Sequence, residues 1–375
     1  MPQIDFVPLL SYTLYFEGSI LIWVLFLVFL CHRGIVLEKE TTTWIMNLGK
    51  AYVIVLILYM GLRPISSVFG DTVNYAAGFR KMAASDAPFQ FEYQREWIYY
   101  NLMQLFAKFS NIHAFYLFCA TVYVGSLALA MKRIFHSYYF IPMLVVMSMF
   151  TFWAYGVNGV RNGMGASLFI LAMTYVDNLP VAIMLCLLGC GMHQSTWMMV
   201  AAAVVAWFVK NSRCFLVAWV LCVVVSYFWG EPVQDFLSQY AVFGNDSRME
   251  GYLTGEGQIG EIVQMEMKFH WDFLIYSSMG VAVGYYFTFV RKFEDEYYHW
   301  IFNIYLLTNA LWVLVIRAIY SNRFAQISWF VLPLVLIYPF MKKRFWDNHE
   351  KMLGYALMAF YAFSFYYNIL RPIIL

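Results

Sequence analysis

Long, uninterrupted apolar runs recur along this 375-residue chain, and they constrain its fold more than any other feature. The first run, residues 9–31, contains a single charged residue, Glu17. About 20 apolar residues are enough to cross the ~30 Å hydrocarbon core of a bilayer, and a helix satisfies its own backbone groups there. The runs are continuous rather than alternating, which excludes a β-barrel. We therefore predict an all-α fold, a polytopic transmembrane helix bundle.

The composition agrees with a membrane protein. Hydrophobic residues make up 62% of the chain and charged residues only 12%, against roughly a quarter in an average soluble domain. This excludes a soluble enzyme, a disordered protein and a disulfide-stapled secreted domain. The net charge of +2 gives no sign of nucleic-acid binding. The six cysteines lie in or at the ends of apolar runs without metal-ligand spacing, and we interpret them as small buried hydrophobic residues.

The chain divides into about twelve predicted spans within a single integral membrane domain, residues 1–375. The pair on either side of His193 is short, so one of its helices could be re-entrant. The predicted spans are 9–31, 44–62, 112–131, 138–155, 162–177, 179–192, 195–209, 214–229, 272–290, 298–316, 324–340 and 353–370.

Basic residues predict the orientation, because short cytoplasmic loops carry an excess of Lys and Arg. Just over half of the 24 basic residues lie in alternate short loops or beside them, and both termini then face outward from a bacterial inner membrane. The absence of Lys and Arg before the first span favours an N-out helix over a cleaved signal peptide. The residues placed in the cytoplasm are Arg33, Lys39, Lys50, Lys132, Arg133, Lys210, Arg213, Arg291, Lys292, Lys342, Lys343, Arg344 and Lys351.

Two long loops, 63–111 and 230–271, fall on the same extracytoplasmic side. The first contains an aromatic stretch, 94–102, that is compatible with an amphipathic helix lying at the interface. The second is acidic, and its residues 244–260 are rich in Gly and polar side chains. We expect that segment to be mobile.

Four charged or ionisable residues gather at the outer ends of the spans: Arg63, Arg161, His193 and Arg323. Each taken singly has an ordinary interpretation, such as an arginine reaching the headgroups or a histidine bonded to a turn. Together they resemble a site that grips an anionic lipid headgroup. His193 could be a general base, a phosphate donor or a metal ligand, but no second His or Cys stands at ligand spacing. We therefore predict no metal.

The neighbouring polar residues extend this candidate site. Arg317 lies close to Arg323, and guanidinium forks suit the oxygens of a pyrophosphate. Asn158 precedes Arg161, and Asp71 with Tyr75 lies in the first outer loop. Glu96 lies in the same loop, and either carboxylate could take a proton from a sugar hydroxyl.

Short motifs in a fixed order resemble the EpsG/Wzy-type polysaccharide polymerases of bacterial inner membranes. The resemblance covers residues from about Gly61 to Pro339. One position departs from the family pattern, because Asn162 follows Arg161 where Gln is usual. The matching segments are Gly61-Leu62-Arg63, Gly70-Asp71 with Tyr75, Glu96 before an aromatic stretch, Arg161-Asn162-Gly163, Met192-His193-Gln194-Ser195 and Asn322-Arg323-Phe324.

The resemblance implies a GT-C-like glycosyltransferase that polymerises undecaprenyl-pyrophosphate-linked oligosaccharide repeats into a surface polysaccharide by block transfer. The activated donor needs no nucleotide, so no cofactor is expected. Arg161, Arg323 and Arg63 are then the pyrophosphate contacts, with Tyr75, Arg317 and Asn158 as further substrate contacts. His193, Asp71 or Glu96 would act as base or orient the acceptor. A chain-length regulator protein is a candidate partner.

Two other functions stay open at the level of sequence. A lipid-linked glycan flippase would need a cavity reachable from both leaflets, with functional charges near the cytoplasmic ends as well. A membrane O-acyltransferase of glycans would place its base near a tunnel from the cytoplasm, whereas His193 is predicted outside.

Overall fold

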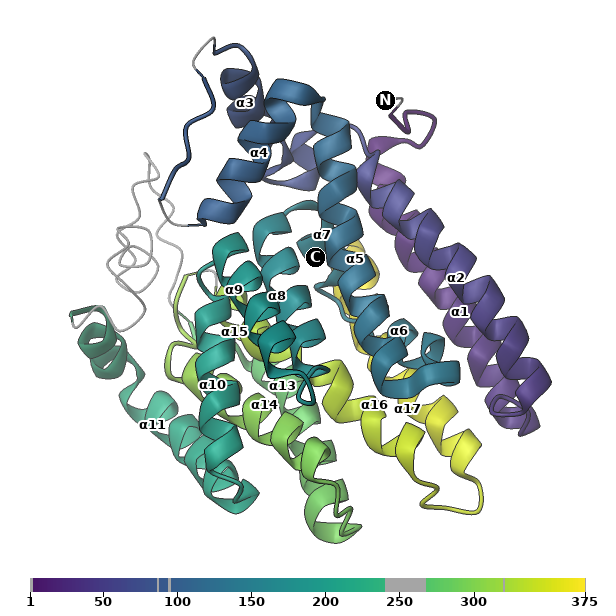
Figure 1. Ribbon diagram of the computed structural model, residues 1–375. Helices are drawn as coiled ribbons and strands as arrows, with labels where there is room; N and C mark the ends of the chain where they lie inside the picture. Colours follow the sequence, from purple (N-terminus) through teal and green to yellow (C-terminus); the bar gives the residue numbers. More distant parts are fainter. Residues whose placement is uncertain (1–2, 86–87, 94–95, 240–267, 320, 375) are drawn as a thin grey trace. The chain divides into compact units, whose positions relative to one another are not determined.

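The computed structural model describes the chain except for residues 1–2, 86–87, 94–95, 240–267, 320 and 375 (Figure 1). All regular structure in the described residues is helical, which confirms the predicted all-α polytopic bundle. The predicted mobile segment, 244–260, lies outside the described residues.

The chain forms two compact units. Unit 1 consists of Met1–Trp197 and Phe340–Leu375, and unit 2 of Met198–Pro339. Helices α10 (Thr196–Phe208) and α16 (Leu332–Lys342) continue across the two boundaries. This division into two units does not test the predicted single membrane domain, which stays a prediction.

Unit 1 contains the helices that carry most of the predicted site residues. Its helices are α1 (Tyr12–Arg33), α2 (Lys39–Gly61), α3 (Thr72–Ala83), α4 (Trp97–Phe109), α5 (Ile112–Phe135), α6 (Phe140–Met147), α7 (Phe152–Val157), α8 (Val160–Met173), α9 (Leu179–Met192), α17 (His349–Phe365) and α18 (Arg371–Ile374), with short 3-10 helices η1 (Leu9–Ser11), η2 (Ser67–Phe69) and η3 (His136–Tyr138) and the π-helical turn η5 (Tyr366–Leu370).

Unit 2 follows the same all-helical pattern. Its helices are α11 (Ser212–Gln239), α13 (Trp271–Tyr285), the π-helical turn η4 (Tyr286–Val290), α14 (Glu296–Leu314) and α15 (Asn322–Trp329).

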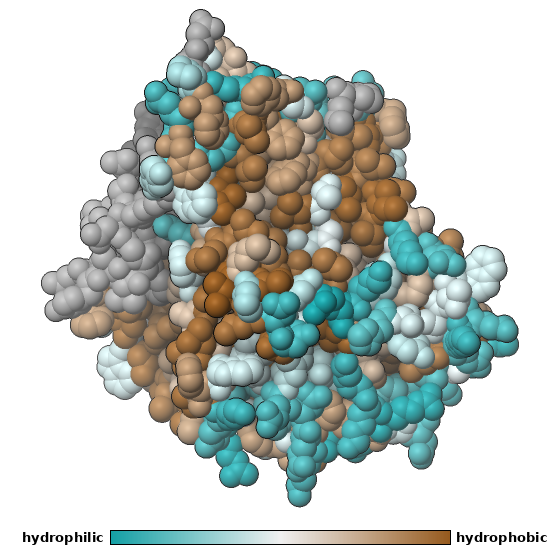
Figure 2. Space-filling view, in the orientation of Figure 1, coloured by the Kyte–Doolittle hydropathy of each residue, from teal (hydrophilic) through white to brown (hydrophobic). Residues whose placement is uncertain are grey.

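Seven described helical segments are long and apolar enough to cross a membrane. Helix α2, for example, has 23 residues and is about 35 Å long at 1.5 Å per residue. Three further apolar helices, α8, α9 and α10, are shorter. Figure 2 shows broad apolar areas on the face that it draws, as expected for a surface that meets lipid.

One predicted span, 138–155, is wrong, because the chain breaks there into α6 and α7. Every residue of α6 is buried, so its apolar character reflects the protein interior. The break exposes backbone carbonyls that must find donors. Ser364 donates to the carbonyl of Ser148, and Asn368 donates to that of Phe150 at 3.0 Å.

The predicted start of the second outer loop, residue 230, is also wrong. Helix α11 continues to Gln239, although Trp229 has non-helical backbone angles and Pro232 follows it. A proline removes one backbone donor and bends a helix without necessarily ending it. The next described helix, α13, begins at Trp271.

Close packing of α8 on α9 brings two predicted site residues to the same end of unit 1. The two helices meet at Gly165 and Gly189, where a Cβ on either glycine would come within 2.9 Å of the other's carbonyl oxygen. Only hydrogen fits at such a contact. Arg161, in the first turn of α8, and His193, just after α9, therefore lie near one another.

Candidate active site

Glu96, Arg161 and His193 meet in one cluster, although they come from three separate segments of unit 1. Arg161 Nη1 pairs with Glu96 Oε2, and His193 Nε2 lies 3.2 Å from Glu96 Oε1. The side chains are 10% exposed for Glu96, 18% for Arg161 and 23% for His193. The cluster is thus largely shielded from water yet still accessible, as a substrate site requires.

The backbone places each of the three groups at a helix end. Glu96 directly precedes α4 and has the left-handed φ of +60°, which costs a non-glycine residue roughly 1–2 kcal/mol. Such a conformation persists where the surrounding structure holds it, often at functional sites. Here the contacts with Arg161 and His193 hold the carboxylate.

The hydrogen bonds of the imidazole define its tautomer. His193 Nδ1 accepts the backbone N–H of Ser195 at 3.2 Å and lies 2.7 Å from the Ser195 hydroxyl. A ring nitrogen that accepts a backbone N–H carries no proton in the neutral ring. In the neutral ring the proton then lies on Nε2, which faces Glu96 Oε1 at 3.2 Å.

Three tyrosines surround the Arg161 guanidinium. Its carbon lies 5.6–5.8 Å from the ring centroids of Tyr75, Tyr99 and Tyr100, within the range of cation–π attraction. Nη1 also donates to the Tyr100 hydroxyl at 3.0 Å. Nε of Arg161 and the hydroxyl of Tyr99 are buried and have no partner among the described residues. A buried unpaired N–H is costly, so these atoms are candidates for ligand contacts.

Asn158 ties the first outer loop to this cluster. Its Oδ1 accepts the backbone N–H of Asp71 at 2.8 Å, and its carbonyl accepts the Tyr75 hydroxyl at 3.2 Å. Gly70 has a φ of +59° and approaches Asn158 so closely that a Cβ would lie 2.4 Å from Oδ1. Asn158 thus positions both Asp71 and Tyr75.

Tyr75 lies within the electric field of the whole cluster. Burial raises the pKa of its phenol, with the Arg161 charge opposing the rise and Asp71 and Glu96 adding to it. The hydroxyl therefore stays protonated at neutral pH. The Asp71 carboxylate accepts from Asn74 Nδ2 at 3.1 Å. Asp71 remains a second candidate base.

Arg63 has the contacts of a structural brace. It is 1% exposed, and it donates to the carbonyls of Met60 at 2.7 Å and Val157 at 2.9 Å. It also donates to Thr72 at 3.0 Å and lies over the Tyr116 ring. Burial lowers the pKa of its guanidinium to about 10, which leaves it charged at neutral pH. Its predicted contact with substrate stays a prediction.

The other two predicted arginines belong to unit 2. Arg317 donates to the carbonyl of Tyr227 at 3.2 Å and lies over the Phe269 ring. Arg323 is exposed in the first turn of α15. The roles of Arg323 as a pyrophosphate contact and of Arg317 as a further substrate contact stay predictions.

Comparison with protein-family models identifies the chain. The model of the EpsG family matches residues 48–373, which is most of the sequence. The chain belongs to the EpsG family. No curated protein and no solved structure matches it. At the family level, EpsG membership indicates a glycosyltransferase-like polysaccharide polymerase, here on a multi-pass membrane protein.

Three residues beside the site of this EpsG family member escaped the sequence reasoning: Tyr99, Tyr100 and Ser195. The sequence spacing could have predicted the two tyrosines, because residues three and four positions after Glu96 lie on the same side of a helix as Glu96. The segment His193-Gln194-Ser195 was visible as a motif, but the contact of its serine with Nδ1 was not.

The donor set shows no metal-binding arrangement. Within the described ranges, no three His, Cys, Asp or Glu side chains come together as metal ligands. Metal independence stays a prediction to be tested with a chelator.

Proposed function

We propose that this EpsG family protein polymerises undecaprenyl-pyrophosphate-linked oligosaccharide repeats by glycosyl block transfer on the extracytoplasmic side of a bacterial inner membrane. The observation that carries this proposal is the Glu96–Arg161–His193 cluster in a chain of this family. The cluster places a carboxylate, a guanidinium and an imidazole within one shielded site. These are the groups that a displacement at an activated sugar needs.

Arg161 is the proposed contact for the donor pyrophosphate. One of its amino groups is engaged by Glu96 and Tyr100, while Nε remains without a partner in the described part of the chain. A phosphate oxygen at Nε would complete its hydrogen bonding. The positive charge would then stabilise the charge that develops on the leaving pyrophosphate, where a preorganised donor contributes most.

Glu96 is the proposed base. Each carboxylate oxygen has two lone pairs, so Glu96 can hold Arg161 and His193 and still accept a proton. The acceptor hydroxyl oxygen would attack the anomeric carbon and pass its proton to Glu96. The bond from that carbon to the pyrophosphate oxygen would break, and the pyrophosphate would keep the electron pair. A single displacement of this kind inverts the anomeric centre.

His193 is the proposed positioning group. Its Nε2–H directs Glu96 Oε1, and its Nδ1 is held by Ser195. Removing the imidazole would free the carboxylate to rotate. A general base must lie within hydrogen-bond reach of the proton that it takes, so the rate should fall even if the protein folds normally.

The test is chain extension by the purified protein supplied only with lipid-linked repeats. Glu96→Gln should lower the rate by about 10²–10⁴-fold, the usual contribution of a general base. Asp177→Asn is the matched control, because Asp177 is a 74% exposed carboxylate in unit 1 that pairs with Arg133. Asp71→Asn tests the second candidate base. Extension at the wild-type rate by Glu96→Gln would overturn the assignment, and no extension by the wild-type protein would favour a transporter.

A further inference from the structure

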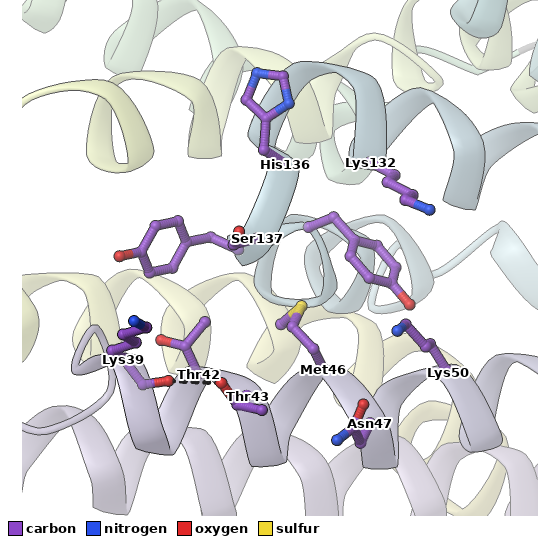
Figure 3. A pocket seen from close by; sticks show the side chains of 11 residues that line it. Lys39, Thr42, Thr43, Met46, Asn47, Lys50, Lys132, His136 and Ser137 are labelled. Atoms are coloured by element: carbon purple, nitrogen blue, oxygen red, sulfur yellow. Dashed lines mark hydrogen bonds between the residues drawn. The ribbon is translucent and has the colours of Figure 1, made fainter.

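A polar hollow lies at the beginning of α2, at the other end of that helix from Arg63 (Figure 3). Its volume is about 610 Å³. We call it the lysine pocket. It is lined by Lys39, Thr42, Thr43, Met46, Asn47, Lys50, Lys132, His136, Ser137, Tyr138 and Tyr139.

One face of α2 builds one wall of the lysine pocket. The lining residues between Lys39 and Lys50 follow one another at steps of three, one, three, one and three, which keeps them on a single helix face. The end of α5 and the helix η3 form the opposite wall, and both pack against α2. The chain turns sharply between them, since His136 has a positive φ of 51°. Figure 3 shows Lys39 and Lys50 at the two ends of the α2 row, with Lys132 above Lys50.

The residues that line the lysine pocket carry positive charge only. Three ammonium groups line it, and no carboxylate does. Within the described residues, Lys39, Lys50 and Lys132 make no side-chain ion pair or hydrogen bond. An anion in the pocket is attracted by the ammonium groups, most strongly by those closest to it. The lining hydroxyl of Ser137 adds a neutral donor that suits a phosphate oxygen, whereas the Thr43 hydroxyl donates to the carbonyl of Lys39 at 2.8 Å.

The surface beside the lysine pocket suits acyl chains. On α2, Trp44 is 71% exposed and lies beside the pocket face, next to Thr43 and one turn before Asn47 and Leu48. The same helix is long and apolar enough to cross a membrane. Tryptophan is enriched where the hydrocarbon meets the headgroups. A ligand with a phosphate head and apolar tails would therefore match the pocket and its flank together.

We propose that the lysine pocket binds the phosphate headgroup of an anionic phospholipid, with its acyl chains alongside Trp44. Lys39 and Lys132 belong to loops predicted to be cytoplasmic, and Lys50 lies near the same end of the predicted span 44–62. Anionic lipids attract basic pockets on that side of the membrane. Lys39 and the lining residues up to Asn47 precede residue 48, where the family match begins. The proposal is independent of the polymerase assignment.

The test is native mass spectrometry of the full chain in detergent, titrated with phosphatidylglycerol and, separately, with phosphatidylcholine. Each Lys→Gln change should weaken phosphatidylglycerol binding about fivefold, and the triple variant K39Q/K50Q/K132Q should weaken it about 100-fold. The corresponding Lys→Arg triple variant keeps the charge and should keep most of the affinity. Lys351→Gln, an exposed lysine of α17 outside the pocket, should bind like the wild type.

Two arms separate a lipid from a soluble phosphate. Inorganic phosphate at 10-fold excess over lipid should leave the phosphatidylglycerol complex intact, because it lacks the tails. Displacement of the lipid by phosphate alone would overturn the lipid assignment, and so would equal binding of phosphatidylcholine. Unchanged phosphatidylglycerol binding by the triple Lys→Gln variant, shown by circular dichroism to be folded, would overturn the pocket itself.

Discussion

Removing the positive charge from Arg161 should destabilise the protein in a way that a second substitution repairs. Arg161→Gln leaves the Glu96 carboxylate without its cation at a side chain that is only 10% exposed. Breaking a fully buried pair costs about 3–5 kcal/mol. Arg161 is 18% exposed, and His193 stays on the other oxygen, so we expect a loss of about 2 kcal/mol. At roughly 2 °C per kcal/mol, the melting temperature should fall by about 4 °C.

The repair is the double variant Glu96→Gln/Arg161→Gln, in which neither charge remains. Replacing both members of a buried pair is often close to neutral, so its melting temperature should lie well above that of Arg161→Gln alone. The assay is thermal unfolding of the four proteins of the cycle in one detergent at one scan rate. The expected coupling is about 1–2 kcal/mol.

The same four proteins separate stability from function. Chain extension should stay at least about 10²-fold below wild type in the double variant. The guanidinium that contacts the pyrophosphate and the carboxylate that acts as base are both gone. The control pair is Arg133 with Asp177, at 3.7 Å and with Asp177 74% exposed. Its coupling should stay below about 1 kcal/mol. A double variant no more stable than Arg161→Gln would refute the electrostatic reasoning, and one that extends chains normally would refute the mechanism.

Three further outcomes are expected. His193→Ala should lower chain extension about 10²-fold through lost alignment of Glu96, whereas Ser195→Ala, which removes only a hydroxyl at Nδ1, should cost about fivefold; equal losses would contradict the positioning role. Chain extension should survive a chelator such as EDTA, and its loss, restored by adding a divalent cation, would reject the metal-free reaction. Reporters fused after Lys210 and after Gly244 should report opposite sides of the membrane, and two reports from one side would reject the predicted topology.

The break between α6 and α7 shows what local sequence does not contain. Residues 138–155 are almost uniformly apolar, so hydropathy predicts a continuous span. The structure breaks the helix because Ser364 and Asn368, more than 200 residues away, supply donors to the freed carbonyls. A window that sees about 20 residues has no access to that compensation.

The two candidate carboxylates of the first outer loop illustrate the same point at the site. Sequence reasoning found both Asp71 and Glu96 and could not rank them, because each is an acidic residue near aromatic neighbours. The contact of Glu96 with Arg161, 65 residues later, distinguishes it. Arg63 shows the opposite relation between sequence and structure. A charge at the end of a span predicts a functional residue, but the buried side chain of Arg63 donates hydrogen bonds to backbone carbonyls and so supports the fold.

The sequence by itself determined that the chain is a helical membrane protein of the EpsG type, because apolar runs of membrane length and the order of short motifs are local properties. It also identified the residues that meet in the cluster, since charges at the ends of apolar helices are rare and costly. Only the tertiary structure decided which of them touch. That choice depends on the glycine contact that brings α8 against α9 and on the left-handed turn that aims Glu96, and neither follows from the periodicity of any single segment.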